Sequence, residues 1–445
     1  MHPKISPLLT DLYQFTMLQG YLDRQMHETA VFELFIRTLP VQRGFFMAAG
    51  LESVIEFLED LKFSEEELKY LASSGRFSQN VIGYLAKLRF TGDLDAMPEG
   101  TVFFPNEPIL RIAAPMPVAQ LIESRIINLL HVQTLLASKA ARCFLAADGR
   151  VGLVDFGLRR AHGAEAGLYA ARSSYIAGFD GTSTVLAEHL YGIPAFGTMA
   201  HSFIEAHQDE KEAFIHFAES NPQIVTLLID TYDTIAGAGK VVEIKKRLDQ
   251  KGITIRGVRL DSGDLLELSG KVRAIFDRSG LGNVRIFVSG NIDEYAIRDL
   301  LSAGAPINAF GVGTKLDTSA DIPYFDCAYK LMEYAGQPRL KKSEGKATWP
   351  GRKQVYRHCR DGEMVRDILT LEGDRQDGTP LIKPFMRGGR RIGRPEGLKD
   401  IRGHALRQIA ALPGYLKALE HTPPYSVEIS PGLEQLRAEV EKKLG

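Results

Sequence analysis

The chain is poor in cysteine, carries almost no net charge and has no long hydrophobic run. Its three cysteines, Cys143, Cys327 and Cys359, are far apart; they fit no zinc-binding spacing, and an odd number argues against a disulfide framework. A formal net charge of -1 provides no basic excess for nucleic-acid or anionic-membrane binding. The sequence has neither a membrane-span run nor a signal-peptide run. We therefore expect a reduced, cytoplasmic protein without nucleic-acid or membrane partners.

The composition is that of a globular protein, with 44% hydrophobic and 24% charged residues among 445. This length predicts two or three domains with large cores. Residues 1–117 contain a helix start at 6–11, a strand-like run at 29–36, three helices and several short strands from 92 onward. Ser64 and Glu67 form a capping box for the second of these helices. A long amphipathic helical pattern follows at 118–147.

From residue 151 the pattern changes to alternating strands and helices. The predicted strands are 151–156, 195–199, 224–230, 253–260, 284–289 and 307–312, with one or two more near 175–190 and 325–335. The predicted helices between them include 207–219, 239–250, 265–278 and 293–303. Such alternation indicates βαβ units and a parallel sheet, and favours an irregular β/α barrel over residues 118–325. An open doubly wound sheet is the alternative. Residues 326–445 lack this alternation and mix strands with helices.

Four segments run from apolar residues into small or charged ones, as the ends of barrel strands do. They are 154–159, 196–201, 258–264 and 310–314. In a β/α barrel all strands end on one rim, and that rim carries the chemistry. We therefore expect these segments to meet in one pocket.

Glycines in two of the expected strand ends suggest a phosphate site. Gly311 and Gly313 precede Thr314, and Gly290 and Asn291 end the preceding strand. Glycine lets the backbone approach an anion closely, and successive N–H groups can cradle a phosphate. A tight turn is the alternative for a single Gly-x-Gly.

Charged residues at the other strand ends suggest binding of a sugar diphosphate. Arg259 and Asp261 are two residues apart, so a strand places them on one side. The aspartate can hold ribose hydroxyls or a magnesium-bound diphosphate, and the arginine can bind a phosphate or carboxylate. An ordinary ion pair is the alternative for these two. His201 is placed to act as a base, a ligand or a phosphate acceptor, while Phe156 offers a face to a planar ring and Arg159 a fork to a carboxylate.

Taken together, six segments resemble those of the nicotinate phosphoribosyltransferase family. They occur in family order at 9–17 (LTDLYQFTM), 156–161 (FGLRRA), 197–203 (GTMAHSF), 258–265 (VRLDSGDL), 288–293 (VSGNID) and 310–314 (FGVGT). The resemblance covers residues 9 to about 360. It implies the type II phosphoribosyltransferase fold, an irregular β/α barrel packed on an α/β sandwich to which residues 1–117 and 326–445 contribute.

The resemblance also implies an activity and a set of site residues. The family joins nicotinate to phosphoribosyl diphosphate, as the first step of NAD synthesis from nicotinate, and couples this reaction to ATP hydrolysis through a phosphohistidine. It is a homodimer with shared active sites and uses Mg²⁺, for which Asp261 is a possible ligand. The residues implied are His201 as the phosphohistidine; Arg159 and Asp261 at the reacting groups; Asp11 and Tyr13 from the partner; Phe156, Thr182 and Ser183 at the pyridine; Arg259 at the ribose and phosphate; and Gly290, Asn291, Gly311, Gly313 and Thr314 at the 5′-phosphate.

Several alternatives remain open. A nicotinamide-using relative carries an acid where this chain has Ser183, and a neutral hydroxyl suits the carboxylate of nicotinate better. A quinolinate-using relative is shorter and needs a denser basic cluster. A non-catalytic phosphoribosyl or nucleotide sensor would not need His201, Arg159 and Asp261 together. A barrel aldolase or isomerase needs a strand-end lysine, for which Lys315 is the nearby candidate.

Overall fold

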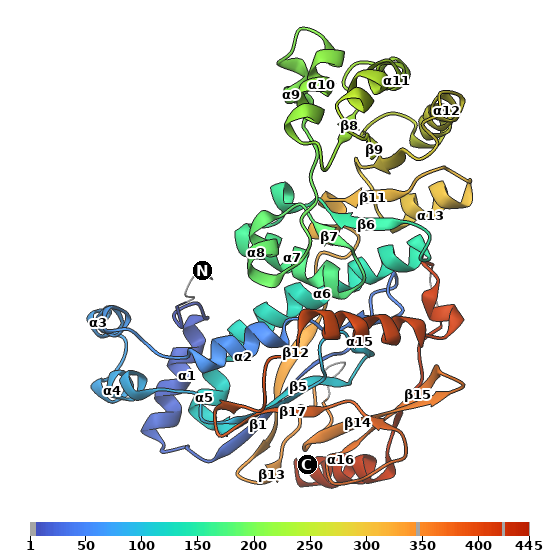
Figure 1. The fold of residues 1–445 in the computed structure, drawn as a ribbon. Coiled ribbons are helices and arrows are strands. Elements are labelled where there is room, and N and C mark those ends of the chain that lie inside the picture. The colour runs from blue at the N-terminus through green and yellow to red at the C-terminus, as the bar shows by residue number, and fades with distance from the viewer. Residues whose placement is uncertain (1–5, 344–347, 421–422, 445) are drawn as a thin grey trace. The chain divides into compact units, whose positions relative to one another are not determined.

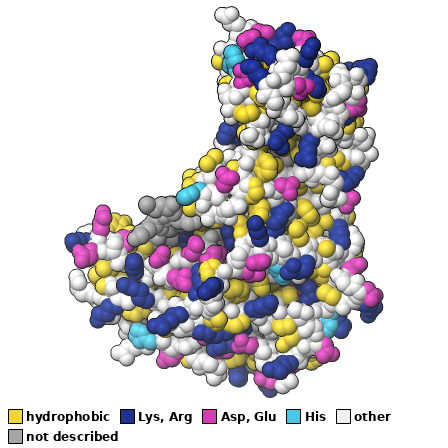
Figure 2. All heavy atoms as spheres, viewed as in Figure 1, with side chains coloured by type: hydrophobic (Ala, Val, Ile, Leu, Met, Phe, Trp, Pro, Cys, Tyr) yellow, Lys and Arg dark blue, Asp and Glu magenta, His cyan; other side chains and the backbone are white. Residues whose placement is uncertain are grey.

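The computed structural model describes residues 6–343, 348–420 and 423–444, which form two compact units. The first unit combines Met1–Ser138 with Tyr324–Gly445, and the second is Lys139–Pro323. The boundary falls inside the long helix α6 (Glu123–Ala147), whereas the sequence pattern suggested a boundary before it, at 117. Among the described residues, no helix is long and apolar enough to cross a membrane. On the face drawn in Figure 2, basic and acidic side chains are interspersed, in keeping with the small net charge.

The first unit is built on a mixed-length antiparallel sheet. In the described chain its strand order is β13-β12-β1-β5-β3-β17-β18. The central strand β1 (TAVFELFI) is buried at every position except Thr29, which is why it lies between two long partners. The strands are β1 (Thr29–Ile36), β3 (Asp93–Ala96), β5 (Pro108–Pro115), β12 (Cys327–Tyr334), β13 (Gln337–Pro338), β17 (Lys383–Arg387) and β18 (Arg390–Arg391).

Two smaller sheets and a set of helices complete this unit (Figure 1). The smaller sheets pair β2 (Phe46–Met47) with β4 (Val102–Phe103), and order β16 (Thr379–Pro380), β14 (Lys353–Arg360), β15 (Glu363–Leu371) and β19 (Val427–Ile429). The helices are α1 (Leu12–Asp23), α2 (Leu51–Glu59), α3 (Glu65–Ser73), α4 (Gln79–Lys87), α5 (Met116–Leu121), α15 (Leu398–Ala410), η2 (Gly414–Lys417) and α16 (Pro431–Leu444). The predicted capping box of Ser64 and Glu67 is confirmed at the start of α3.

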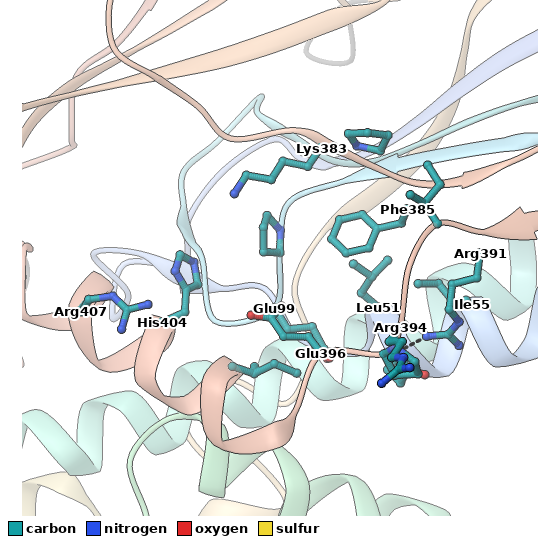
Figure 3. Close-up of a pocket in the computed structure, with 16 residues that line it drawn as sticks. Leu51, Ile55, Glu99, Lys383, Phe385, Arg391, Arg394, Glu396, His404 and Arg407 are labelled. Carbon is teal, nitrogen blue, oxygen red and sulfur yellow. Dashed lines mark hydrogen bonds and ion pairs between the residues drawn. The ribbon is translucent and has the colours of Figure 1, made fainter.

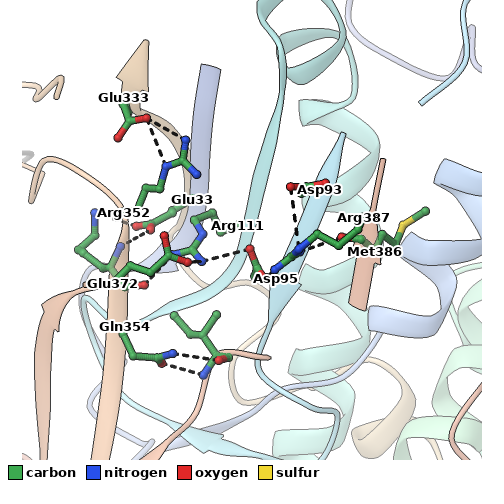
Figure 4. A network of polar contacts seen from close by, with 12 residues as sticks. Glu33, Asp93, Asp95, Arg111, Glu333, Arg352, Gln354, Glu372, Met386 and Arg387 are labelled. Carbon is green, nitrogen blue, oxygen red and sulfur yellow. Dashed lines mark hydrogen bonds and ion pairs between the residues drawn. The ribbon is translucent and has the colours of Figure 1, made fainter. Parts of the chain in front are cut away.

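Buried charges of the first unit are paired across its strands. The Glu33 carboxylate is fully buried and lies 2.7 Å from the Lys353 ammonium. Arg111 donates to the Lys353 carbonyl at 2.8 Å and pairs with Asp95 at 3.1 Å, and Arg387 reaches the same aspartate at 2.6 Å (Figure 4). Because a buried charge is costly unless it is paired, these contacts fix the segments that follow residue 350 against the central sheet.

The second unit contains a parallel sheet whose strand order identifies it as an irregular barrel. Among the described residues the order is β7-β6-β11-β10-β9-β8, with every pair parallel. The strands therefore follow chain order around a ring in which β11 pairs with β6, as in a β/α barrel and unlike a doubly wound sheet, while no pairing joins β7 to β8 among the described residues. The expected α/β fold class is confirmed. The strands are β6 (Gly152–Asp155), β7 (Gly181–Thr182), β8 (Thr226–Leu228), β9 (Gly257–Leu260), β10 (Arg285–Val288) and β11 (Ala309–Val312).

Helices follow these strands along the chain. They are η1 (Leu158–Arg160), α7 (Ala164–Ile176), α8 (Val185–Tyr191), α9 (His201–Glu205), α10 (Glu210–Ser220), α11 (Thr234–Gln250), α12 (Leu265–Arg278), α13 (Glu294–Ser302) and α14 (Thr314–Asp317). Aspartates cap three of the longer ones: Asp233, Asp264 and Asp293 each accept a backbone N–H from the first turn of α11, α12 and α13.

One strand prediction was wrong, and another predicted strand belongs to a different sheet. Residues 195–199 form no strand and touch the sheet through one bridge, between Ala195 and Thr182, because β7 is only two residues long and offers little to pair with. This short contact is the irregular part of the barrel, and His201 consequently follows a loop. Residues 325–335 do form a strand, but β12 pairs antiparallel with β1 in the first unit.

Candidate active site

The end of β6 is tied to the segment after β7 by one buried aspartate. The Asp155 carboxylate accepts hydrogen bonds from the Gly157 N–H at 2.8 Å and the Thr182 hydroxyl at 2.6 Å. The Ser183 N–H donates to the Asp155 carbonyl at 2.8 Å. Asp155 therefore positions two sequence-predicted segments at once, the one that carries Phe156 and the one that carries Thr182 and Ser183.

Phe156 lies across glycines at the end of β11. A Cβ placed on Gly311 would come within 2.7 Å of the Phe156 ring, and one on Gly313 would lie 3.1 Å from the Phe156 carbonyl. The Phe156 ring also packs against Phe287, with centroids 5.4 Å apart. The half-buried ring is thus held by backbone that only glycine permits to approach so closely, and part of it stays accessible to a planar ligand.

A second buried carboxyl, Asp317, packs beneath this loop. A Cβ on Gly157 would lie only 2.0 Å from its carboxyl group. Burial, together with the negative charge of Asp155, raises the pKa of Asp317 to about 10. Asp317 is therefore neutral at pH 7, which removes the repulsion that two buried carboxylates would otherwise exert.

Asp317→Asn should flatten the pH dependence of stability. In the folded protein Asp317 holds a proton up to a pKa of about 10, whereas an unfolded aspartate loses it near pH 4, so the free energy of unfolding falls as pH rises between these values. Asparagine cannot ionise, and we expect it to raise the free energy of unfolding at pH 8 by about 1–3 kcal/mol. Urea unfolding at several pH values measures this.

Asp293 provides a control of opposite sign. Burial opposes its ionisation, but the Lys315 ammonium at 2.6 Å lowers its pKa overall, so its contribution is lost as pH falls. Asp293→Asn should therefore reduce stability at neutral pH. An unaltered pH slope in Asp317→Asn would contradict the assignment of a neutral carboxyl.

His201 lies beside Asp261. Its Nε2 is 4.0 Å from Asp261 Oδ2, and its Nδ1 is 3.1 Å from the Thr231 hydroxyl. Both side chains of the His201–Asp261 pair are 38% exposed, so a ligand can reach them. The structure thus brings together two residues that are 60 positions apart in the chain, although one of them follows a loop.

Arg259 has a buried donor that lacks a partner in the described part of the chain. One of its terminal N–H groups donates to the Thr198 hydroxyl at 2.8 Å, but its Nε has no hydrogen-bond partner within the described residues. Burial lowers the pKa of Arg259; the carboxylates of Asp261 and Asp230 oppose this, and the positive charge of Arg159 adds to it. Arg159, which is exposed, is therefore close enough to act on Arg259, and the two form a cationic region suited to an anion.

The backbone after β10 is shaped by a required glycine. Gly290 has φ +89°, and a Cβ there would lie 1.9 Å from the Asp261 carbonyl oxygen. Asn291 continues with φ +55°. Ser289 donates its hydroxyl to the Asp261 carboxylate. Together these contacts fix Asp261 against the 290–291 turn, which points the same way along the barrel as the Gly311–Thr314 segment.

The carboxylates of Asp230 and Asp261 suit a metal ion that is bound mainly by the phosphate oxygens of a substrate. No cluster of three or more His, Cys, Asp or Glu side chains that could hold a metal occurs among the described residues. Asp230 accepts the Asp261 N–H at 2.8 Å and the Ser262 hydroxyl at 2.7 Å through Oδ2, while its buried Oδ1 has no described partner. One or two carboxylates plus phosphate oxygens is the usual Mg²⁺ environment, so Asp230 and Asp261 fit that ion.

Two predicted residues belong to the other unit, and the lysine that an alternative function would need is paired. Asp11 and Tyr13 belong to the first unit, at the start of α1, where Asp11 accepts the Ser124 hydroxyl at 2.6 Å and Tyr13 is 48% exposed. Lys315, the candidate for an aldolase lysine, is paired with Asp293.

Sequence reasoning missed four residues that support the site, one of which is Asp155. Asp230 and Thr231 follow β8 after an apolar run, which is the same signal that identified the other strand ends, so they could have been found. Asp317 lies in the short helix α14, and nothing in the local pattern indicates that it packs beneath Gly157.

Comparison with known proteins agrees with these motifs. The profile of the nicotinate phosphoribosyltransferase N-terminal domain matches residues 8–131, and that of the nicotinate phosphoribosyltransferase family matches residues 151–357. The chain is 50% identical to nicotinate phosphoribosyltransferase pncB2 of Mycobacterium tuberculosis over 428 residues, covering 96% of this chain and 92% of that one. It is 42% identical to the nicotinate phosphoribosyltransferase of Bacillus subtilis, covering 80% of this chain and 75% of that one.

Solved structures agree as well. The crystal structure of human nicotinic acid phosphoribosyltransferase superposes with a TM-score of 0.88 at 29% identity, covering 98% of this chain and 99% of that one. Nicotinate-nucleotide pyrophosphorylase from Pyrococcus furiosus gives 0.75 at 26% identity, covering 92% and 98%. From its motifs, fold and relatives, this chain belongs to the nicotinate phosphoribosyltransferase family.

Proposed function

We propose that this protein transfers the phosphoribosyl group of phosphoribosyl diphosphate to nicotinate, giving nicotinate mononucleotide and diphosphate. This is the first step of NAD synthesis from nicotinate. The observation that carries the proposal is the assembly, within one unit, of a ring-binding phenylalanine, a cationic region around Arg259 and the His201–Asp261 pair. Relatives over most of the chain bear the same activity in their names.

The nicotinate ring would lie on Phe156, with its carboxylate near Arg159 and Ser183. Arginine binds a carboxylate through paired N–H groups, and the serine hydroxyl can donate a further hydrogen bond. The pyridine nitrogen would then face the anomeric carbon of the sugar. Positioning of this kind contributes much of the rate acceleration because the attacking nitrogen needs no further activation.

At the anomeric carbon, the bond to the pyridine nitrogen forms as the bond to the diphosphate oxygen breaks, and the diphosphate leaves with the electron pair. Positive charge develops on the sugar and negative charge on the leaving group. Arg259, with its unpaired Nε–H, and Arg159 would stabilise the leaving group, while the Gly290–Asn291 and Gly311–Thr314 turns would hold the 5′-phosphate. Mg²⁺, held by Asp230 and Asp261 with the diphosphate, would neutralise further charge.

ATP hydrolysis would be coupled through His201. An imidazole nitrogen would attack the γ-phosphorus, ADP would leave, and water would later release the phosphate. Because Nδ1 contacts the Thr231 hydroxyl, Nε2 is the free nitrogen, and it carries the lone pair when Nδ1–H donates to that hydroxyl. A phosphoryl group next to Asp261 would alter the charge that the diphosphate meets, which couples the two reactions.

The working enzyme would be a cytoplasmic homodimer. Asp11 and Tyr13 would reach the partner's site, where the exposed Tyr13 ring would cover the face of nicotinate opposite Phe156.

Ser183→Asp should move the acceptor preference from nicotinate toward nicotinamide. A carboxylate at this position repels the carboxylate of nicotinate and accepts the amide N–H of nicotinamide. We expect the ratio of kcat/KM values for the two acceptors to fall by about 100-fold, with most of the loss in KM for nicotinate. Ser183→Ala, which removes the hydroxyl without adding charge, is the control. An unchanged ratio in Ser183→Asp would show that this position does not set the preference.

The proposed activity is tested by mixing the protein with phosphoribosyl diphosphate, Mg²⁺ and each of nicotinate, nicotinamide and quinolinate, with and without ATP. Mononucleotide formation from nicotinate, increased by ATP, is the expected result. Product from nicotinamide or quinolinate alone would overturn the assignment of substrate. No product from any of them would favour a non-catalytic sensor of phosphoribosyl compounds.

A further inference from the structure

The first unit contains a cavity of about 430 Å³, in the size range of small-molecule sites. Its wall comes from α2, the 98–99 turn, the β17–β18 region and α15, all within one compact unit (Figure 3). None of its lining residues belongs to the group assigned above to catalysis.

One side of the cavity is cationic. Lys383, His404 and Arg407 lie together in Figure 3. Among the described residues, neither Lys383 nor Arg407 makes an ion pair, whereas Arg391 on the same cavity wall is held by Glu52 at 2.8 Å and Glu59 at 3.0 Å. Two exposed cations on one side of a cavity, neither of them in an ion pair with a described residue, can attract an anion.

The pKa of His404 is lowered in part by the positive charges on this side of the cavity. Burial, followed by the charges of Arg407 and Lys383, lowers the pKa of His404 to about 4. The imidazole is therefore neutral at pH 7, and its Nε2 is 3.0 Å from the Thr101 hydroxyl. Because Nε2 contacts Thr101, the other ring nitrogen of His404, Nδ1, can form a hydrogen bond with a ligand, and the neutral ring adds no charge.

Acidic residues also line the wall, and they offset part of this positive charge. Glu99 accepts the Gly50 N–H at 2.6 Å and is thus engaged by the backbone. Burial and the neighbouring carboxylates of Asp400 and Glu99 raise the pKa of Glu396, against the smaller opposing effect of Lys383 and Arg407. Lys383 and Arg407 thus act on the Glu396 carboxylate, and the cavity wall keeps a small basic excess, with four basic residues against three acidic ones.

The opposite side of the cavity carries apolar side chains, with Arg391 and Arg394 beside them (Figure 3). Leu51 and Ile55 project from α2, and the Phe385 ring from β17 lies next to them (Figure 3). A flat or apolar body fits there, because aromatic and aliphatic side chains gain by excluding water from it.

We propose that this cavity binds a phosphate monoester with a ring-shaped body, the phosphate between Lys383 and Arg407 and the ring against Phe385. A phosphate monoester carries a charge of about −1.5 to −2 at pH 7, which matches two cations, whereas a single carboxylate leaves one of them unbalanced. The inference concerns binding in the first unit and does not depend on the proposed activity.

Pyridoxal 5′-phosphate is a suitable probe. Its phosphate and ring match the cavity, and the Lys383 amine can condense with its aldehyde with loss of water, after which borohydride reduces the imine to a stable secondary amine. Peptide mapping then identifies the labelled lysine in the intact protein, so that labelling elsewhere, including at the catalytic site, is distinguished. Pyridoxal, which lacks the phosphate, serves as the matched probe.

We expect Lys383 to be labelled about tenfold more than the exposed Lys87 of α4, and excess adenosine 5′-monophosphate, but not adenosine, to suppress this. Arg407→Ala should reduce labelling of Lys383 about tenfold, while Lys87→Ala, the control, should not. Circular dichroism spectra of each variant are compared with the spectrum of the unsubstituted protein, so that misfolding is distinguished from loss of binding. Equal labelling of Lys383 and Lys87, equal labelling by pyridoxal, or no effect in a folded Arg407→Ala would each overturn the proposal.

Discussion

Replacement of His201 by alanine is expected to abolish transfer of label from γ-labelled ATP to the protein, together with the stimulation of product formation by ATP. The reason is that His201 is the only proposed phosphate acceptor, and its Nε2 faces Asp261 at 4.0 Å in an accessible position. Formation of nicotinate mononucleotide without ATP should persist, because the pyridine nitrogen and not the histidine attacks the sugar. Acid-labile label on the protein and product formation, measured side by side, separate the two effects.

Two further variants sharpen this experiment. Thr231→Val should slow labelling without removing it, since it takes away the hydroxyl that orients Nδ1 but leaves the nucleophile. His207→Ala removes a half-buried histidine whose ring contacts His216, and should label normally. Label retained on the His201→Ala protein would refute the assignment of His201.

Gly290→Ala is expected to damage both stability and activity. Its Cβ would lie 1.9 Å from the Asp261 carbonyl oxygen at a φ of +89°, so the turn and the end of β9 must move apart. Left-handed strain alone costs about 1–3 kcal/mol, and a displacement of about 1 Å at reacting groups costs about 100-fold in rate. We expect kcat/KM to fall by about 100-fold or more, with a lower melting temperature.

Gly280→Ala is the matched control, because Gly280 also has a positive φ, +70°, but its Cβ would meet no atom within 4 Å. It should lose about 1 kcal/mol of stability and keep its activity. Equal losses in the two variants would mean that the contact between Gly290 and Asp261 has no role in the site.

The sequence predicted the strand ends well where the local pattern was strong. β9 and β11 are apolar runs that end in Arg-Leu-Asp and Gly-Val-Gly, and both end where they were expected. It failed at 195–199, because an apolar stretch forms a strand only if it has a partner, and β7 provides just two residues. For β12 the strand itself was predicted correctly, but not its sheet, because its pairing with β1 depends on the whole first unit.

The contacts within the site were less predictable than its members. Motifs indicated that His201 and Asp261 matter, but their proximity depends on the loop that follows Ala195. The support of the Phe156 loop by Asp155 and Asp317 could not be inferred, because it results from the absence of a side chain at Gly157 and the burial of a carboxyl 160 positions away. Motifs in the sequence therefore identify the residues expected to take part in the reaction more easily than the residues that position them.

The most direct test of this account is a crystal structure of the protein with nicotinate mononucleotide bound. The account predicts that the pyridine ring lies on Phe156, the carboxylate lies near Arg159 and Ser183, and the phosphate lies between the Gly290–Asn291 and Gly311–Thr314 turns. A nucleotide bound away from the strand ends of the second unit, with Phe156 and Arg259 untouched, would contradict it.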